Sequence, residues 1–326
     1  MFSKLAIAVP FGITDEDRVL WVRGQDIKFE QPMFRDAIWG ARTSGTADAV
    51  IQTDFASLIK TASQLDEVVP AGLIFHVGRC GSTLLSNALR AVNGTLVLSE
   101  PGFLGSLLKR HVNNKNLLSP QQNQENTALL QKSFITILGA AAPNHENGVY
   151  LKFASWSSLL LEQIQLIWPN TPIAFAFREP LDVLDSILAK RIGWMKFYNT
   201  PGFVSGLLNE GEDSLKDLPF INFAVKVLTE IYKSGLKLTD DDLLISYGNN
   251  RMDNIEKLLA HFNLRASAAD QLAIAESTRY YSKDRRKQRL FTENENTRKY
   301  ILNHQTKALI DASGIHQIYQ TLGKFS

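Results

Sequence analysis

The stretch that most constrains the fold covers residues 71–89 and reads AGLIFHVGRCGSTLLSNAL. Its apolar first part, residues 72–77, predicts a buried strand, and the glycines that follow mark a tight loop. Ser82 and Thr83 then stand where a helix over residues 82–92 would begin. Such a strand, glycine loop and helix can cradle an anion, because glycines let the backbone approach it closely and a helix N-terminus carries about half a positive charge.

The loop at residues 78–81 differs from that of nucleoside-triphosphate P-loop proteins. Those proteins place a lysine between the last glycine and the Ser or Thr, whereas here Gly81 is followed directly by Ser82. The positive side chain of the loop is instead Arg79. A plain strand-to-helix turn of any α/β protein is the alternative, so the function must be read from the rest of the chain.

From residue 69 onward, short apolar segments alternate with helical patterns, which is typical of parallel βαβ units. The polar stretch 111–126, rich in Asn and Gln, is interpreted as a surface loop. The pattern predicts an α/β domain over residues 69–326, with a parallel sheet of about five strands covered by helices on both faces. We expect strands at 72–77, 95–99, 148–153, 172–177 and 242–247, and helices at 82–92, 123–141, 155–167, 181–191, 219–235 and 252–263.

Residues 1–68 have a different character and are interpreted as a small N-terminal appendage on the main domain. Aromatic residues such as Trp21 and Phe34 are scattered there among charges, and they indicate packing rather than a binding site. One amphipathic helix is expected within residues 50–65. The sequence gives no function for this region.

The composition limits the partners of the chain. With 326 residues, 44% of them hydrophobic, it can bury a full core. Its 35 basic and 33 acidic residues give a net charge of +2, so no global field attracts nucleic acid and any anion site must be local. Cys80, the single cysteine, excludes an intrachain disulfide and fits a reducing compartment. Without a signal-peptide pattern or a run of roughly 20 apolar residues, we expect a cytoplasmic protein with no stable membrane insertion.

Residues 78–84 resemble the loop P-[RK]-S-G-T-T with which sulfotransferases hold the 5′-phosphosulfate of PAPS (3′-phosphoadenosine 5′-phosphosulfate). Gly78, Cys80 and Ser82 replace the proline, the serine and a threonine of that pattern. The resemblance implies a P-loop-like fold and a donor site formed by this loop. Its expected donor-binding residues are Gly78, Arg79, Cys80, Gly81, Ser82 and Thr83.

A second motif follows the strand expected at 172–177. Arg178 stands directly after it, and Ser186 follows eight residues later. In sulfotransferases an arginine and a serine at these places hold the 3′-phosphate of PAPS, and the planar guanidinium suits that task because it can contact two phosphate oxygens. The resemblance carries these roles to Arg178 and Ser186. The alternative is an arginine paired with Glu179 or Asp182.

Two further strand ends carry charged residues. Glu100 follows the strand at 95–99, and the tyrosylprotein branch of the sulfotransferases has its proposed catalytic base here. The cytosolic branch uses a histidine two residues after a lysine, whereas this chain has Ala154 two residues after Lys152. The resemblance is therefore closer to the tyrosylprotein branch and assigns the base to Glu100, which could alternatively be a first-turn acid of a helix. His76 lies inside a buried strand and is expected to be a core residue.

The last part of the resemblance lies between residues 243 and 287. Tyr247 ends a late apolar strand, where it could contact adenosine or pack in the core. The segment 276–287 is the densest cationic stretch, and sulfotransferases close such a loop over the nucleotide; a solvated helix face is the alternative. The resemblance implies roles for Lys283, Arg285 and Arg286 in donor binding and for Ser277 beside Lys152 at the departing oxygen.

Together these features predict a PAPS-dependent sulfotransferase that transfers a sulfuryl group in line to a hydroxyl, or to an amine. Arg79 would hold the transferring group, Glu100 would accept the proton of the acceptor, and no metal is expected. One rival is a P-loop phosphotransferase or hydrolase, and another is a binding module without catalysis. The sequence does not identify the acceptor or the oligomeric state.

Overall fold

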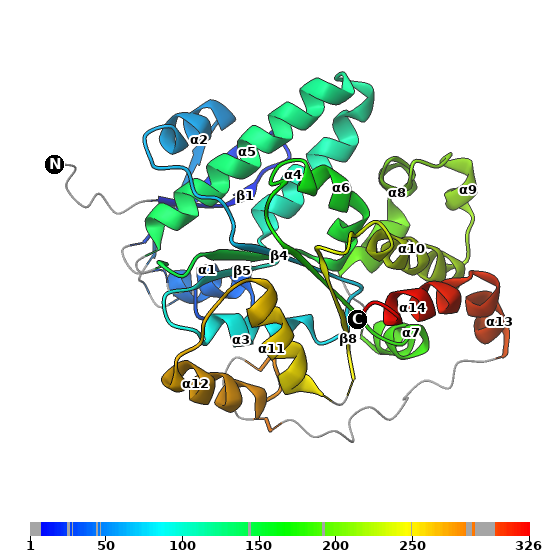
Figure 1. The fold of residues 1–326 in the computed structure, drawn as a ribbon. Helices are drawn as coiled ribbons and strands as arrows, with labels where there is room; N and C mark the ends of the chain where they lie inside the picture. The colour runs from blue at the N-terminus through cyan, green and yellow to red at the C-terminus, as the bar shows by residue number, and fades with distance from the viewer. Residues whose placement is uncertain are drawn as a thin grey trace.

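The computed structural model describes residues 8–284, except 25, 26, 28, 44, 46, 143, 144, 191, 192 and 249, together with 289, 290 and 304–326. At its centre lies a parallel sheet of five strands in the order β5-β6-β4-β7-β8 (Figure 1). Each strand falls inside a range expected from the sequence. The strands are β4 (Gly72–His76), β5 (Leu96–Ser99), β6 (Val149–Lys152), β7 (Ile173–Phe177) and β8 (Leu243–Ser246).

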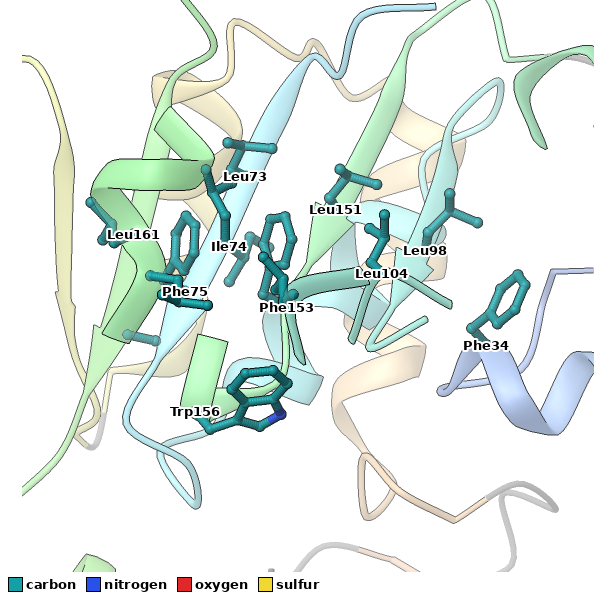
Figure 2. Packing of buried hydrophobic residues seen from close by; sticks show 14 of the residues in the cluster. Phe34, Leu73, Ile74, Phe75, Leu98, Leu104, Leu151, Phe153, Trp156 and Leu161 are labelled. Carbon is teal, nitrogen blue, oxygen red and sulfur yellow. The ribbon is translucent and has the colours of Figure 1, made fainter. Parts of the chain in front are cut away.

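The strands form because they are short apolar runs that become buried on both faces. All five residues of β4 are buried, and so are all five residues of β7. Phe75 of β4 stacks on Phe153, with ring centroids 4.9 Å apart, and Figure 2 shows both side chains in the buried core. Helices on both faces complete the burial, so the expected α/β class is confirmed.

The helices form two layers (Figure 1). On one side of the sheet lie α3 (Ser82–Arg90), α11 (Arg251–His261) and α12 (Ala268–Thr278). On the other side lie α4 (Gly102–Asn113), α5 (Pro120–Ala141), the 3-10 helix η2 (Ser155–Leu160) and α6 (Leu161–Gln165). The remaining helical elements are η1 (Asn114–Asn116), α7 (Pro180–Ala189), η3 (Gly193–Asn199), α8 (Pro201–Leu208), α9 (Asp213–Lys216), α10 (Phe220–Gly235), α13 (His304–Ala312) and α14 (Ile315–Gly323).

The expected surface loop at residues 111–126 is wrong. This stretch contains the end of α4, the short η1 and the start of α5. Ser119 caps α5 in a capping box with Gln122, and a serine three residues before a glutamine is a sequence signal for a helix start. Asn123 is buried, where its amide donates to the carbonyl oxygen of His111 at 2.8 Å. The polar side chains here serve helix ends and a buried contact.

The N-terminal region has its own antiparallel sheet, in the order β1-β2-β3. The single helix expected within residues 50–65 is wrong at its start, because a strand and a helix share that range. Asp54 separates the two: its carboxylate accepts from the N–H of Ser57 at 2.8 Å and caps the helix. The elements are β1 (Ala8–Ile13), β2 (Val19–Gly24), α1 (Phe34–Thr43), β3 (Ala47–Thr53) and α2 (Phe55–Ala62).

The N-terminal elements pack on α4 and α5. Phe34 of α1 meets Phe134 of α5 edge to face at 6.1 Å, and Phe134 in turn stacks on Phe103 of α4 at 4.6 Å. The two sheets thus share one buried core. Whether residues 1–68 form a separate unit stays a prediction. None of the helices among the described residues has the length and apolarity to cross a membrane.

Candidate active site

One large cleft opens where the parallel strands end. Its volume is about 1560 Å³, and the residues that follow each of the five strands line it. These are Gly78 after β4, Glu100 after β5, Phe153 after β6, Arg178 after β7 and Tyr247 after β8. Ligands of open α/β sheets bind at this edge, because the connections there leave a crevice. The sheet order, which the sequence did not predict, thus brings the separate motifs together.

The cleft is much more basic than the chain as a whole. Its described lining contains nine arginines and lysines but only four aspartates and glutamates, whereas the whole chain carries a net charge of +2. Such a local concentration of one sign raises the potential inside a cleft. The cleft is therefore suited to a polyanion.

The loop between β4 and α3 adopts a backbone that presents N–H groups. Gly78, Arg79 and Gly81 all have positive φ, at 87°, 55° and 78°. Among the described residues, no backbone oxygen accepts from the N–H groups of residues 79–81 or of Thr83. Free N–H donors at a helix N-terminus form an anion site. Ser82 and Thr83 also line this end of the cleft.

Gly81 is needed for packing as well as for its backbone angle. A Cβ atom at this position would lie 2.5 Å from the ring of Tyr247. Tyr247 is held in place by its backbone N–H, which donates to Phe177 at 2.8 Å. The ring of Tyr247 therefore closes directly over the loop, between Gly81 and Arg178.

Cys80 contributes its main chain to the loop. Its thiol is buried and donates to the carbonyl oxygen of Ala176 at 3.2 Å, which turns the side chain toward the sheet. Burial raises the pKa of this thiol above its usual range, so the thiol stays protonated.

The two sequence motifs meet across the cleft. The Arg79 Nε donates to the Ser186 hydroxyl at 2.7 Å, and the Arg178 guanidinium donates to the carbonyl oxygen of Arg79 at 3.3 Å. Arg178 also forms an ion pair with Asp182 at 3.2 Å and lies over the ring of Tyr247, 4.9 Å from its centroid. Arg178 therefore pairs with Asp182, which was the alternative from the sequence, and also lies beside the loop.

Tyr232 of α10 is a supporting contact that the sequence did not suggest. Its hydroxyl is buried and donates to the carbonyl oxygen of Arg178. Because Arg178 follows the end of β7, this contact fixes the backbone from which the guanidinium extends.

Glu100 and Lys152 form an ion pair at the neighbouring strand ends. The Lys152 ammonium donates to Oε1 of Glu100 and is fully buried, whereas the Glu100 side chain is 26% exposed and lines the cleft. Burial would raise the pKa of Glu100, but the Lys152 charge and the nearby His76 outweigh it and hold that pKa well below its usual range. Glu100 is therefore ionised. Its φ of 51° is rare for a residue with a side chain, and such strain is concentrated at functional sites.

Lys152 is a buried member of this ion pair. Its side chain has no exposed surface and is not part of the described cleft lining. The ammonium contacts Glu100, and its expected role at the departing oxygen stays a prediction. The structure supports a role in holding the carboxylate.

His76 is a satisfied core residue, as the sequence suggested. Its Nδ1 accepts from the N–H of Gly78 at 3.0 Å, so its Nε2 carries the proton and donates to the carbonyl oxygen of Phe153 at 3.0 Å. Burial, with the charge of Lys152, lowers the pKa of His76 to about 4. The ring is neutral, and its Nε2 lies 3.7 Å from the Glu100 carboxylate.

The described part of the cationic segment after α12 reaches the cleft. Lys283 lines it, and the backbone beside it is held by Asn87 of α3, whose amide donates to the carbonyl oxygen of Ser282 at 2.8 Å. Burial, together with the charge of Arg79, lowers the pKa of Lys283 to about 8. Arg285 and Arg286 lie outside the described residues.

The expected role of Ser277 stays a prediction. This residue lies on α12, where its hydroxyl donates to the carbonyl oxygen of Ile274 at 2.7 Å, and it is not part of the described cleft lining. A hydroxyl near the end of a helix commonly bonds back to its own helix in this way.

The sequence missed the far wall of the cleft. Trp156 of η2 meets Phe197 of η3 edge to face at 5.5 Å, and Lys109 of α4 lies over Phe197, 5.4 Å from its centroid. Residues of the N-terminal region, among them Arg35 and Asp36, line the cleft as well. The helical spacing of small residues and Lys109 along α4 was a sequence signal that could have revealed this wall. No sequence signal indicated that N-terminal residues would line the cleft.

Comparisons with known proteins identify the fold. No protein-family model matches the chain, and no curated protein matches it. Among solved structures, the sulfotransferase STF9 from Mycobacterium avium is similar with a TM-score of 0.51 and 14% sequence identity, over 82% of this chain and 81% of the other. The chain therefore has the fold of a sulfotransferase.

Two further solved structures are similar at lower TM-scores. The sulfotransferase domain of the curacin biosynthetic pathway has a TM-score of 0.44 and 15% identity, over 76% of this chain and 98% of the other. The sulfotransferase domain of the olefin synthase from Synechococcus PCC 7002 has a TM-score of 0.41 and 13% identity, over 76% and 95% of the two chains.

Proposed function

We propose that this protein is a sulfotransferase that moves a sulfuryl group from PAPS to a hydroxyl of an acceptor, or to an amine. The observation that carries the proposal is the contact between two distant motifs. Arg79 of the glycine loop donates to Ser186 at 2.7 Å across 107 positions of sequence, and Arg178 donates to the backbone of Arg79. A loop that binds a 5′-phosphosulfate and a pair that binds a 3′-phosphate must be adjacent in this way to hold one nucleotide.

The residues around the loop fit the donor. The free N–H groups of residues 79–81 would bind the 5′-phosphosulfate, while Arg178 and Ser186 would bind the 3′-phosphate. Arg178 would exchange Asp182 for a phosphate, since both side chains line the cleft. Tyr247 and Lys283 line the same end and would contact the nucleotide.

Glu100 would accept the proton of the acceptor. As the acceptor oxygen attacks sulfur, the bond from sulfur to the 5′-phosphate oxygen breaks, 3′-phosphoadenosine 5′-phosphate (PAP) leaves, and the acceptor proton moves to the Glu100 carboxylate. The carboxylate is ionised, as a proton acceptor must be, and the attacking oxygen becomes acidic as its bond to sulfur forms. Arg79 and the loop N–H groups would stabilise charge on the moving group.

Lys152 is assigned a positioning role. Its buried ammonium holds the Glu100 carboxylate at the cleft wall and keeps it ionised. Ser277 has no role in the proposed step. The proposal also places the enzyme in the cytoplasm, where a buried free thiol such as Cys80 stays reduced.

The main rival is a P-loop phosphotransferase or hydrolase. Its loop lysine would have to follow Gly81, where Ser82 stands, and the positive charge of this loop comes from Arg79. A binding module without catalysis is the second rival. It does not account for a strained, ionised Glu100 at the cleft wall.

Product analysis tests the proposed function. The purified protein is incubated with PAPS and a metabolite extract, and mass spectrometry searches for compounds heavier by one sulfo group and for released PAP. We expect both to appear with the wild type, and the sulfated product to form much more slowly with Glu100→Gln. Two results would contradict sulfuryl transfer to an acceptor. In the first, PAPS stays intact with every extract; in the second, PAPS gives PAP and free sulfate without a sulfated compound.

A further inference from the structure

One face of α4 lines the cleft and leads away from Glu100; we call this face the floor of the cleft. Gly102, Gly105, Ser106 and Lys109 all line the cleft, at the three- and four-residue spacing that places them on one side of the helix. A Cβ atom on Gly102 would meet nothing within 4 Å, and one on Gly105 would meet only Trp156, at 3.8 Å. The small residues therefore leave open space beside Glu100 at the start of the helix.

Aromatic side chains line this space. Trp156 and Phe197 meet at 5.5 Å, and Phe203 packs against Phe197 at 4.8 Å. Tyr198 and Phe220 also line the cleft here, with ring centroids 5.3 Å apart. Such a wall binds the apolar body of a ligand.

Two lysines stand at the end of this floor without an acidic partner. Lys109 and Lys196 both line the cleft, and no carboxylate among the described residues pairs with either. Lys109 lies over the ring of Phe197, 5.4 Å from its centroid, and Lys196 is the residue directly before Phe197. Burial and the charge of Lys196 both lower the pKa of Lys109. Two neighbouring cations in a cleft raise the local potential and attract an anion.

Lys109 lies away from the part of the cleft that would bind PAPS, which we call the donor end and which contains the loop at residues 78–83 and Arg178. Donor phosphates would lie at Arg79 and Arg178, whereas Lys109 stands seven residues along α4 from Gly102, about 10 Å at the rise of a helix. An acceptor whose hydroxyl reaches Glu100 would extend along the floor toward Lys109.

We propose that the acceptor is a hydroxyl compound with an apolar or aromatic body and a terminal anionic group, a carboxylate or a phosphate, which binds Lys109 with support from Lys196. This inference rests on the proposed function, since it places the acceptor beside the donor. It adds the chemical class of the acceptor.

Calorimetric titration tests the inference through matched pairs of probes. ω-Hydroxydecanoate and para-hydroxyphenylpropionate are each compared with their methyl esters, and decyl phosphate with decanol, all in the absence and in the presence of saturating PAP, which fills the donor end. We expect at least one acid to bind about tenfold or more tightly than its neutral partner, because a charge-assisted hydrogen bond is lost with the ester. The carboxylate and phosphate pairs show which anion fits.

Variants of Lys109 locate the binding. Lys109→Met keeps the apolar stem and is expected to abolish the preference for the acid, whereas Lys109→Arg keeps it. Lys233→Met, a lysine on α10 outside the cleft, is the matched control and should change nothing. Melting temperatures identify any variant that is not folded. If Lys109→Met is not folded, Lys196→Met carries the test, and it is expected to weaken the preference for the acid.

Two results would overturn the inference: equal affinity for acid and ester in every pair, including no binding of either, or an acid preference that survives Lys109→Met. Failure of the proposed function is a separate result. It would appear as absent PAP binding in the titration of the protein with PAP alone.

Discussion

The two ends of the cleft are built in different ways. At the proposed donor end, a backbone loop would supply the binding groups, and Gly78, Gly81 and the strand ends fix its geometry. At the proposed acceptor end, side chains from α4, η2 and η3 come together, with small residues that leave space and Lys109 that supplies charge. The donor end therefore depends on a few short motifs, while the acceptor end depends on packing between distant segments.

This difference explains what could be read from the sequence. Backbone loops need glycines at fixed places, so the loop at residues 78–83 and Arg178 stand out in the bare sequence. An aromatic wall needs only bulky residues brought together by folding, and Trp156 and Phe197 look like ordinary core residues until the fold is known. We therefore expect few substitutions in the donor-end loop to preserve PAPS binding. More substitutions should be tolerated in the aromatic wall of the acceptor end.

The largest effect is expected where the two ends meet, at Glu100. Glu100→Gln keeps the shape of the side chain but removes proton acceptance, so turnover should fall by about 10²–10⁴ while PAP affinity stays nearly constant. The same change leaves the Lys152 ammonium buried without its partner. Removing one member of a buried pair costs roughly 3–5 kcal/mol, and less here because Glu100 is partly exposed, so the melting temperature should fall as well.

A double variant separates these two consequences. Glu100→Gln combined with Lys152→Met removes the unpaired charge and should regain most of the lost stability without regaining turnover. Kinetics and thermal melts on both variants are the measurement. A stable double variant with near-normal turnover would mean that Glu100 stabilises the folded protein and does not accept the proton of the acceptor.

The next largest effect tests the donor end. Arg178→Ala should weaken PAP by about tenfold or more, since charge-assisted hydrogen bonds contribute roughly 1.5–3 kcal/mol each. Binding of AMP, which lacks the 3′-phosphate, should barely change. Equal losses for PAP and AMP in parallel titrations would show that Arg178 supports the fold of the loop and does not read the 3′-phosphate.

Lys283 should make donor binding depend on pH. Its pKa in the free protein is lowered to about 8 by burial and by Arg79, and a bound anion would raise it again. Between about pH 7 and about pH 9 the free protein loses the proton, so PAP affinity should fall by several-fold, up to about tenfold. Lys283→Met should flatten this part of the profile. A profile that keeps its slope in the variant would place the titrating group elsewhere.

The smallest effect is expected at Ser277. Its hydroxyl bonds to its own helix, away from the described cleft lining, so Ser277→Ala should leave turnover within about twofold of wild type. Steady-state rates at saturating PAPS measure this. A loss of tenfold or more would restore the role that the sequence resemblance gave this serine.

Local patterns predicted the main strands well, and the misses have physical reasons. The five apolar segments are buried on both faces, so their positions follow from composition, whereas their order in the sheet depends on packing that no short segment encodes. The polar residues 111–126 resembled a loop because their composition outweighed the helix-start signal of Ser119 and Gln122, and the buried contact of Asn123 is visible only in the fold. Sequence spacing placed Lys152 correctly at a strand end, but only the structure shows that its ammonium turns inward to Glu100.

The account rests on a donor end that selects a nucleotide with a 3′-phosphate. Calorimetric titration of the wild-type protein with PAP, AMP, and ATP with Mg²⁺ tests this most directly. We expect PAP to bind about tenfold or more tightly than AMP, through Arg178 and Ser186, and more tightly than ATP with Mg²⁺. Tighter binding of ATP with Mg²⁺, or equal binding of PAP and AMP, would contradict the account.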